Sequence, residues 1–201
     1  MGDKNSAYFH RQCRVRISQN HISEIFTEEG VSIKGQALIK LSASKHFQIL
    51  FQEDGHIEEK VVSEFLENVP SLVNAEDNHV LMKPFSEKEI VEVIWAMELD
   101  KAPGPDGFSI HFYKVCWAII KTDLVQMVTA FRRKEKVGGC TNSTFLALIP
   151  KEANPSSFDR FCPISLCNVS YKILAKLLSN RFNLLLSKLI SPLQGGFVKG
   201  R

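Results

Sequence analysis

The sequence predicts a mainly helical α+β fold with a short β-hairpin in its second half. Three observations support this prediction. Apolar residues recur at helical spacing in several segments, short apolar runs of strand-like composition stand beside turn-forming residues, and Gly, Pro, Asn and Asp separate these segments. Hydrophobic residues make up 44% of the 201 residues, which is ordinary for a globular chain with a real core. This length suits one or two domains.

The first 85 residues are expected to form an N-terminal linker region made of a helix, a hairpin and a second helix. The first helix has an approximate apolar stripe beside a basic face, and the hairpin turns at Glu29-Gly30. The three elements are expected at residues 1–20, 21–34 and 35–52. A short helix is indicated around Val61 to Leu66. The polar, acidic stretch after Pro70 predicts a linker or domain edge.

A second domain is expected over residues 86–201. Ser86 and Glu89 have the spacing of a capping box, so a helix is predicted from residue 86 to residue 99. The following Pro-Gly, Pro-Asp and Asp-Gly dipeptides predict a fixed, compact loop, in which Asp106 is expected to be a turn acceptor. Further helices are predicted at residues 109–119, 122–137 and 168–190, and Arg181 is expected on the polar face of the last of them.

The predicted hairpin presents a lysine at the end of a strand. The apolar run Thr144–Ile149 is followed by Pro150 and then by Lys151. Turn-forming residues come next, and residues 161–166 form the return strand. An ammonium group at a strand end suits an anion, although an ordinary surface lysine is the simpler interpretation.

Charge is divided unevenly along the chain. The net charge of +3 combines +3 in residues 1–20, −10 in residues 21–100 and +10 in residues 101–201. The basic half could face a polyanion, or the two halves could neutralise each other across an interface. Arg132, Arg133 and Lys134 likewise suit either a phosphate-contacting patch or the negative end of a helix dipole.

Composition also argues against several classes of protein. The sequence has no run of 18 apolar residues and no apolar segment near its start, so neither a membrane span nor a secretory signal is predicted. The five scattered cysteines favour reduced thiols in an intracellular protein. Intracellular locations here include the nucleus. Cys162 and Cys167 have no nearby second pair or His, so no metal site is predicted.

Four motifs occur in a fixed order and together are specific. They are Lys101–Phe108 (KAPGPDGF), Leu148–Lys151 (LIPK), Pro163–Ile173 (PISLCNVSYKI) and Gln194–Arg201 (QGGFVKGR). The set closely resembles the N-terminal part of the reverse transcriptase of non-LTR (LINE-type) retrotransposons, especially those of plants. Residues 2–10 look like the segment that follows the endonuclease domain in such polyproteins. The resemblance covers essentially the whole chain.

The resemblance implies that residues 86–201 are the fingers and the start of the palm of a right-hand polymerase. The family enzyme copies an RNA template from a DNA primer, with Mg²⁺ ions held by palm aspartates. Those aspartates are expected beyond the Gly-Arg motif, and the chain nowhere contains Asp-Asp. A catalytically incompetent fragment that binds no Mg²⁺ by itself is therefore expected.

Site residues follow from the same resemblance. Lys151, Gln194 and Arg201 would lie at the nucleotide site, with Lys151 on the triphosphate. Lys101 would lie near the template or primer backbone. Arg132, Arg133 and Lys134 are candidates for contact with nucleic acid because of their charge and not because of the resemblance. The family usually has Arg where this chain has Cys162, and a thiol supplies neither the charge nor the forked donors.

Two other functions remain open from the sequence. The +10 charge of residues 101–201 would suit a nucleic-acid-binding module without catalysis. Alternatively, the apolar faces left uncovered without the palm strands would suit a helical protein-interaction domain.

Overall fold

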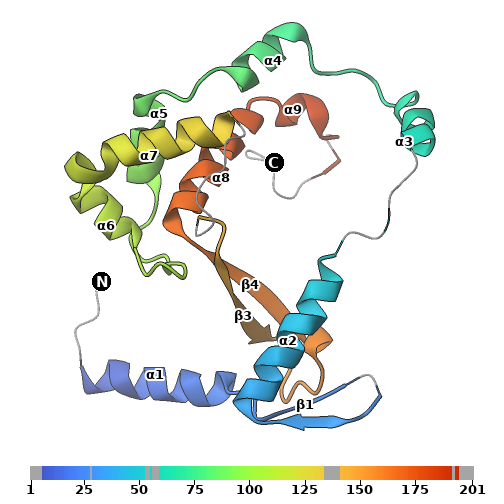
Figure 1. The fold of residues 1–201 in the computed structure, drawn as a ribbon, viewed down its shortest axis with the longest axis vertical. Helices are drawn as coiled ribbons and strands as arrows, with labels where there is room; N and C mark the ends of the chain where they lie inside the picture. The colour runs from blue at the N-terminus through green and yellow to red at the C-terminus, as the bar shows by residue number, and fades with distance from the viewer. Residues whose placement is uncertain are drawn as a thin grey trace. The chain divides into compact units, whose positions relative to one another are not determined.

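The computed structural model describes residues 6–27, 29–52, 55, 59–133, 141–191, 193 and 194. These residues form helices and two small antiparallel hairpins (Figure 1). By their contacts they divide into unit 1, residues 1–56 with 146–164, and unit 2, residues 57–145 with 165–201. Unit 1 is therefore built from two separate stretches of sequence. The predicted domains 1–85 and 86–201 stay a prediction. No helix in the described part is long and apolar enough to cross a membrane.

Unit 1 begins with the predicted helix, hairpin and helix, which the structure confirms. They are α1 (Ala7–Asn20), β1 (Glu24–Phe26), β2 (Ser32–Lys34) and α2 (Gln36–Leu50). In the β1–β2 hairpin Ile25 lies opposite Ile33. Ile25 is fully buried because its side chain points to the core of the unit, as alternation along a strand requires.

The core of unit 1 joins residues from both stretches of sequence. Ile25, Phe158 and Phe161 are buried together, and Leu148 packs against them. Helix α2 is only partly buried: Ile39 and Phe47 are buried, while Leu38, Leu50 and Phe51 are exposed.

The second hairpin is also confirmed. It comprises β3 (Thr144–Pro150), the short 3-10 helix η1 (Phe158–Arg160) and β4 (Phe161–Cys167). At its tip the backbone N–H of Lys151 donates to the carbonyl of Arg160 at 2.9 Å. At its base Thr144 Oγ1 lies 3.5 Å from Cys167 Sγ. The two contacts share one register, so the strands run antiparallel. Residues 146–164 of this hairpin belong to unit 1.

Helices dominate the described part of unit 2. They are α3 (Glu59–Leu66), α4 (Ala75–Met82), α5 (Glu87–Ala96), α6 (Ile110–Val115), α7 (Trp117–Arg132), α8 (Val169–Phe182) and α9 (Leu186–Leu189). The core forms where α5, α6 and α7 pack around α8 (Figure 1). Its buried residues are Ile90, Val93, Ile94, Ile110, Tyr113, Leu124, Val128, Val169, Ile173, Leu174 and Leu177.

Helix α4 replaces part of the predicted linker after Pro70. Asn74 and Asp77 form a reciprocal capping box: Asn74 Oδ1 accepts from the N–H of Asp77 at 2.8 Å, and Asp77 Oδ2 accepts from the N–H of Asn74 at 3.1 Å. The polar residues interpreted as a linker are therefore the start signal of a helix. The predicted capping box of Ser86 and Glu89 is present at the start of α5.

Two helix boundaries differ from the prediction. The break expected after residue 119 occurs at Cys116, whose N–H closes α6 on Phe112 while its carbonyl accepts the first bonds of α7. The single helix expected over 168–190 is interrupted between α8 and α9. There the N–H of Leu185 donates to the carbonyl of Phe182 at 2.8 Å, a tight turn that buries Leu185. Neither break contains the Gly or Pro that marks a boundary in sequence.

Candidate functional site

The loop between α5 and α6 is fastened to the start of α8. Asn168, the residue before α8, is 2% exposed, and its Oδ1 accepts a hydrogen bond from the N–H of Asp106 at 3.2 Å. Gly104 lies so close that a Cβ there would stand 2.3 Å from both the N and the Oδ1 of Asn168. Only glycine fits at this position. Two of the sequence motifs thus meet in one packed joint.

Inside the loop, Asp106 is the predicted turn acceptor. Its Oδ1 accepts from the N–H of Phe108 at 3.0 Å, and the N–H of Gly107 donates to the carbonyl of Gly104 at 3.0 Å. Gly107 has φ +74°, in the left-handed region that favours glycine. The loop has a second fastening, because Lys172 Nζ donates to the carbonyl of Ala102 at 2.8 Å. The sequence motif contains Lys172 but does not reveal this contact.

Lys101 stands at the start of this loop with an exposed side chain. Its Nζ lies 2.7 Å from Glu98 Oε2. The hydrogen bond that the ammonium donates to Glu98, together with the charges of Glu98 and Asp100, raises the pKa of Lys101 above its ordinary value. The ammonium therefore stays charged at the surface. Its contact with nucleic acid remains a prediction.

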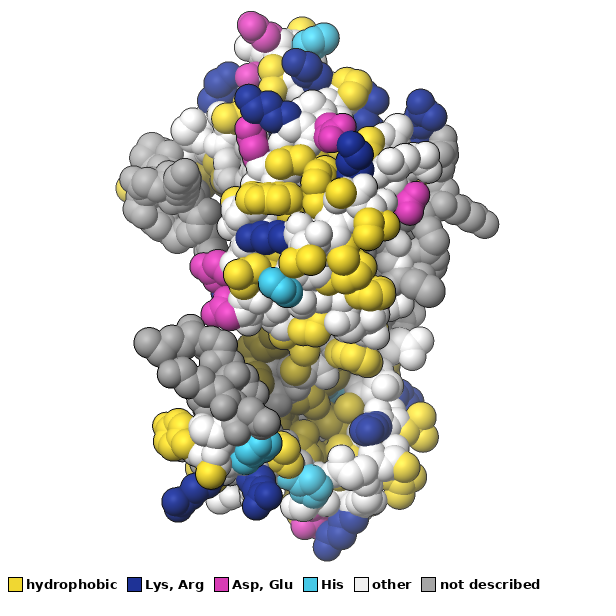
Figure 2. Space-filling model, turned by 90° about the vertical axis from the view of Figure 1, so that its left-hand side faces the viewer, with side chains coloured by type: hydrophobic (Ala, Val, Ile, Leu, Met, Phe, Trp, Pro, Cys, Tyr) yellow, Lys and Arg dark blue, Asp and Glu magenta, His cyan; other side chains and the backbone are white. Residues whose placement is uncertain are grey.

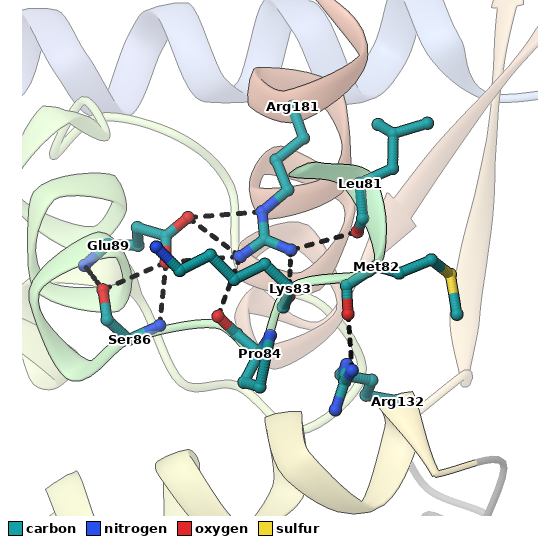
Figure 3. Close-up of polar contacts among 8 residues, drawn as sticks. All are labelled: Leu81, Met82, Lys83, Pro84, Ser86, Glu89, Arg132 and Arg181. Carbon is teal, nitrogen blue, oxygen red and sulfur yellow. Dashed lines mark hydrogen bonds and ion pairs between the residues drawn. The ribbon is translucent and has the colours of Figure 1, made fainter. Parts of the chain in front are cut away.

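Arg181 is the main polar side chain that sequence reasoning placed wrongly. It was expected on the polar face of the last long helix, yet it is 7% exposed. Its guanidinium points at the α4–α5 connection (Figure 3) and donates to the carbonyls of Leu81, Lys83 and Pro84. Arg181 follows the buried Leu177 by four positions, so both lie on one face of α8. This spacing is the signal that could have revealed it.

The same guanidinium also reaches α5. Its Nη2 lies 3.1 Å from Glu89 Oε1, and its central carbon stands 3.9 Å from the centre of the Phe85 ring. Burial raises the pKa of Glu89, but hydrogen bonds from Ser86 and Arg181 outweigh it, so the pKa lies below the ordinary value. Arg181 therefore joins three helices through one forked cation.

One residue of the predicted basic patch, Arg132, contacts the end of α4. Arg132, in the last turn of α7, donates through Nη2 to the carbonyl of Met82 (Figure 3). Both Arg132 and Arg181 thus bind carbonyls at the end of α4, where a helix leaves them without intrahelical partners. Arg133 follows as the residue after α7. Lys134 lies outside the described residues.

Gln194 and Arg201 are the other two residues predicted at the nucleotide site. Gln194 ends a turn after α9, in which its N–H donates to the carbonyl of Ser191 at 3.0 Å. Arg201 lies outside the described residues. Their role at a nucleotide site stays a prediction.

Lys151 lies at the end of β3, as predicted, and is exposed. Its Nζ donates to the carbonyl of Asp159 in η1 at 2.9 Å. An ammonium has three N–H groups, and this bond uses one of them. In the register set by Lys151 and Arg160, Cys162 lies opposite Ile149, with its thiol exposed. Its position next to the tip is where an arginine could add a second cation.

The described residues contain no group of three or more His, Cys, Asp or Glu side chains that could hold a metal ion. Cys13, Cys116, Cys162 and Cys167 are free thiols. The polar contacts described above form fixed backbone turns and cations held by carbonyl oxygens.

Two comparisons with known proteins bear on this chain. No family model matches the chain. The chain is 28% identical, over 200 residues, to a protein described as the transposon TX1 uncharacterized 149 kDa protein of Xenopus laevis. The match covers 99% of this chain but 15% of the length of that protein. The chain is therefore similar along its whole length to a small part of a transposon-encoded protein.

Proposed function

We propose that the chain is a segment of the RNA-directed DNA polymerase of a LINE-type retrotransposon, which includes the fingers and the start of the palm. The observation that supports this best is the joint between Gly104 and Asn168. It brings the KAPGPDGF and PISLCN motifs together, although they are far apart in the sequence. The match to a transposon-encoded protein over the whole chain supports the same origin.

In this proposal the segment positions substrates. Lys151 contacts the triphosphate of an incoming nucleotide, and the fixed loop after Lys101 lies on the backbone of the template–primer duplex. In the complete enzyme, Mg²⁺ held by paired aspartates would stabilise the attacking and leaving oxygens. No Asp-Asp pair occurs in these 201 residues. The chain is therefore expected to bind without polymerising.

Primer extension tests the catalytic half of the proposal. The chain is incubated with an RNA template, an annealed DNA primer, the four deoxynucleotides and Mg²⁺. We expect no more extension than in a reaction without protein, while an active reverse transcriptase in parallel shows that the substrates are sound. Extension by this chain would show that it assembles a complete metal site.

A binding titration tests the other half. Fluorescence anisotropy with a labelled RNA–DNA hybrid should show binding that weakens steeply with salt, because bound cations release counterions from the phosphates. Lys101→Ala should weaken binding about threefold and reduce the salt slope by about one. Lys88→Ala is the matched control, since Lys88 is also an exposed lysine paired with a glutamate, Glu92, at 3.9 Å. Equal losses in both variants would mean that Lys101 has no special place at the interface.

A protein-interaction domain is the second candidate, and exposed apolar surface favours it. Helix α3 has no buried residue, although Phe65 is among its four large apolar side chains. Hydrophobic side chains are visible on the face drawn in Figure 2. At the corner of α6 and α7, Val115 is 68% exposed and Ile119 is 80% exposed. Exposed patches of this kind often mark interfaces. A monodisperse monomer in sedimentation velocity, unchanged by Ile119→Lys, would argue against self-association through this corner.

A further inference from the structure

His46 on α2 holds a polar atom in an unfavourable place. Its Nε2 is shielded from solvent and has no hydrogen-bond partner. The nearest ionisable group across the contact is Asp159, whose Oδ1 lies 3.6 Å away. The imidazole ring packs beside Phe47 at 5.0 Å and Phe158 at 5.3 Å between ring centres. A buried polar atom without a partner destabilises the fold, so a phenylalanine here would pack at lower cost.

Both acidic and basic side chains lie near the imidazole ring of His46. A hollow of about 620 Å³ lies beside it and is lined by residues of α2, the β1–β2 turn and η1. Its ionisable residues are Glu29, Lys45, His46 and Asp159. Beyond the hollow, Arg160 lies 3.7 Å from Glu152 and is therefore already paired. Asp159 is the carboxylate within ion-pair distance of the ring.

Asp159 also touches Lys151 through a different group. Its backbone carbonyl accepts from Lys151 Nζ at 2.9 Å, while the carbonyl of the next residue, Arg160, accepts from the N–H of Lys151 at 2.9 Å. Helix η1 therefore holds Lys151 by its backbone and by its ammonium. Because η1 makes both bonds to Lys151, the place of η1 on α2 also sets where the ammonium lies.

We propose that His46 is a positioning residue for Lys151, which it controls through Asp159 and through its own protonation. A protonated imidazole donates a charge-assisted hydrogen bond to the Asp159 carboxylate, fixes η1 on α2 and holds the Lys151 ammonium at the strand end. A neutral imidazole has lost the charge that attracts the Asp159 carboxylate, so its contact with Asp159 is weaker and η1 opens more often. The anion that Lys151 receives, a nucleoside triphosphate, rests on the proposed function; the latch between His46 and Asp159 does not.

Hydrogen exchange of the full chain tests the latch directly. Exchange of peptides covering residues 151–160 is measured by mass spectrometry at about pH 6 and pH 8 and corrected for the intrinsic rates. The unmodified chain should be about two- to fivefold more protected at the lower pH, the range expected for a partly exposed ion pair. His46→Gln and Asp159→Asn should both remove this difference. The proposal is overturned if the difference persists in His46→Gln.

His21→Gln is the matched control. His21 is another histidine of unit 1, but its Nε2 lies 3.2 Å from Gln36 Nε2 rather than near η1. This variant should keep the pH dependence of the unmodified chain. Loss of the dependence in His21→Gln as well would assign it to general destabilisation of unit 1 and would overturn the proposal.

Nucleotide binding tests the consequence for Lys151. Calorimetry with dTTP and Mg²⁺ at the same two pH values compares each variant with the unmodified chain, so that titration of the nucleotide phosphates cancels. His46→Gln should weaken binding about two- to fivefold at pH 6 and leave it unchanged at pH 8. An equal loss at both pH values would make His46 a packing residue and contradict its positioning role. If Lys151→Ala leaves the affinity for dTTP unchanged, Lys151 does not bind the nucleotide and the proposed function fails at this residue. The hydrogen-exchange result still shows whether His46 and Asp159 hold η1 on α2.

Discussion

The side-chain oxygen of Asn168 accepts the backbone N–H of Asp106 across 62 positions of sequence. This bond gives the N–H of a loop residue an acceptor on Asn168, the residue just before α8. The loop and the helix are therefore fixed as one piece. The close approach of Gly104 to the same asparagine leaves no room for adjustment. The joint therefore behaves as a packed core element, although it contains a loop.

The first prediction concerns glycine at this joint. Gly104→Ala should destabilise the chain by about 3 kcal/mol, because the new methyl group would meet the backbone of Asn168, which cannot rotate away. Gly107→Ala is the control: it has φ +74° but no atom within 4 Å of the new Cβ, so it should cost about 1 kcal/mol. Urea denaturation measures both. A loss at residue 104 no larger than that at residue 107 would mean that the neighbours of Gly104 move aside for the methyl group, which would contradict a rigid joint.

The second prediction concerns the forked cation at Arg181. Arg181→Lys should cost about 2–3 kcal/mol, because a lysine cannot reach several carbonyls and Glu89 together, and buried carbonyls lose their donors. Lys176→Ala, on the exposed side of the same helix, should change stability by less than about 0.5 kcal/mol. Thermal unfolding followed by circular dichroism compares them. A lysine variant as stable as the unmodified chain would show that the network adds no stability.

The third prediction concerns acid. The pKa of Glu89 is lowered in the folded state, so its contribution to stability is present above the ordinary glutamate pKa and is lost as the pH falls through the lowered value. The pKa of Asp77 is also lowered, chiefly by the hydrogen bond from Lys188, and its contribution has the same sign. Stability from urea titrations should therefore decrease between about pH 5 and pH 3. Glu89→Gln should be less stable at neutral pH and lose less on acidification; an unchanged acid slope would contradict the assignment.

The fourth prediction restores a cation near Lys151. Cys162→Arg should increase affinity for dTTP with Mg²⁺ about three- to tenfold, because an exposed guanidinium on β4 can pair with phosphate oxygens. Cys13→Arg adds the same charge at another exposed cysteine of unit 1 and should have little effect. Calorimetric titration decides between them. A similar gain in both variants would reflect net charge rather than a site at the hairpin.

Local signals in the sequence predicted much of the fold. The capping box of Ser86 and Glu89, the turn at Asp106 and the strand before Lys151 each depend on residues a few positions apart, and the structure confirms them. The box of Asn74 and Asp77 was missed because its polar residues were interpreted as a linker. It too could have been found locally.

Features that depend on distant partners could not be found in this way. Arg181 looks like a surface cation until the carbonyls at the end of α4 are in place around it. The orphaned nitrogen of His46 becomes visible only when η1 packs on α2. The interruption between α8 and α9 contains no Gly or Pro, and the burial of Leu185 accompanies it. Tertiary contacts decided each of these.

The split sequence of unit 1 also has a consequence for the order of folding during synthesis. Ile25 leaves the ribosome long before Phe158 and Phe161, which complete its core. A two-stranded hairpin such as β1–β2 is barely stable alone. Its apolar face therefore stays exposed until Phe158 and Phe161 have been made. Helices α4 to α7 emerge during that interval. The β1–β2 hairpin is therefore made before α4 to α7 but completes its packing after they have emerged, and a chaperone that shields nascent apolar segments would act there.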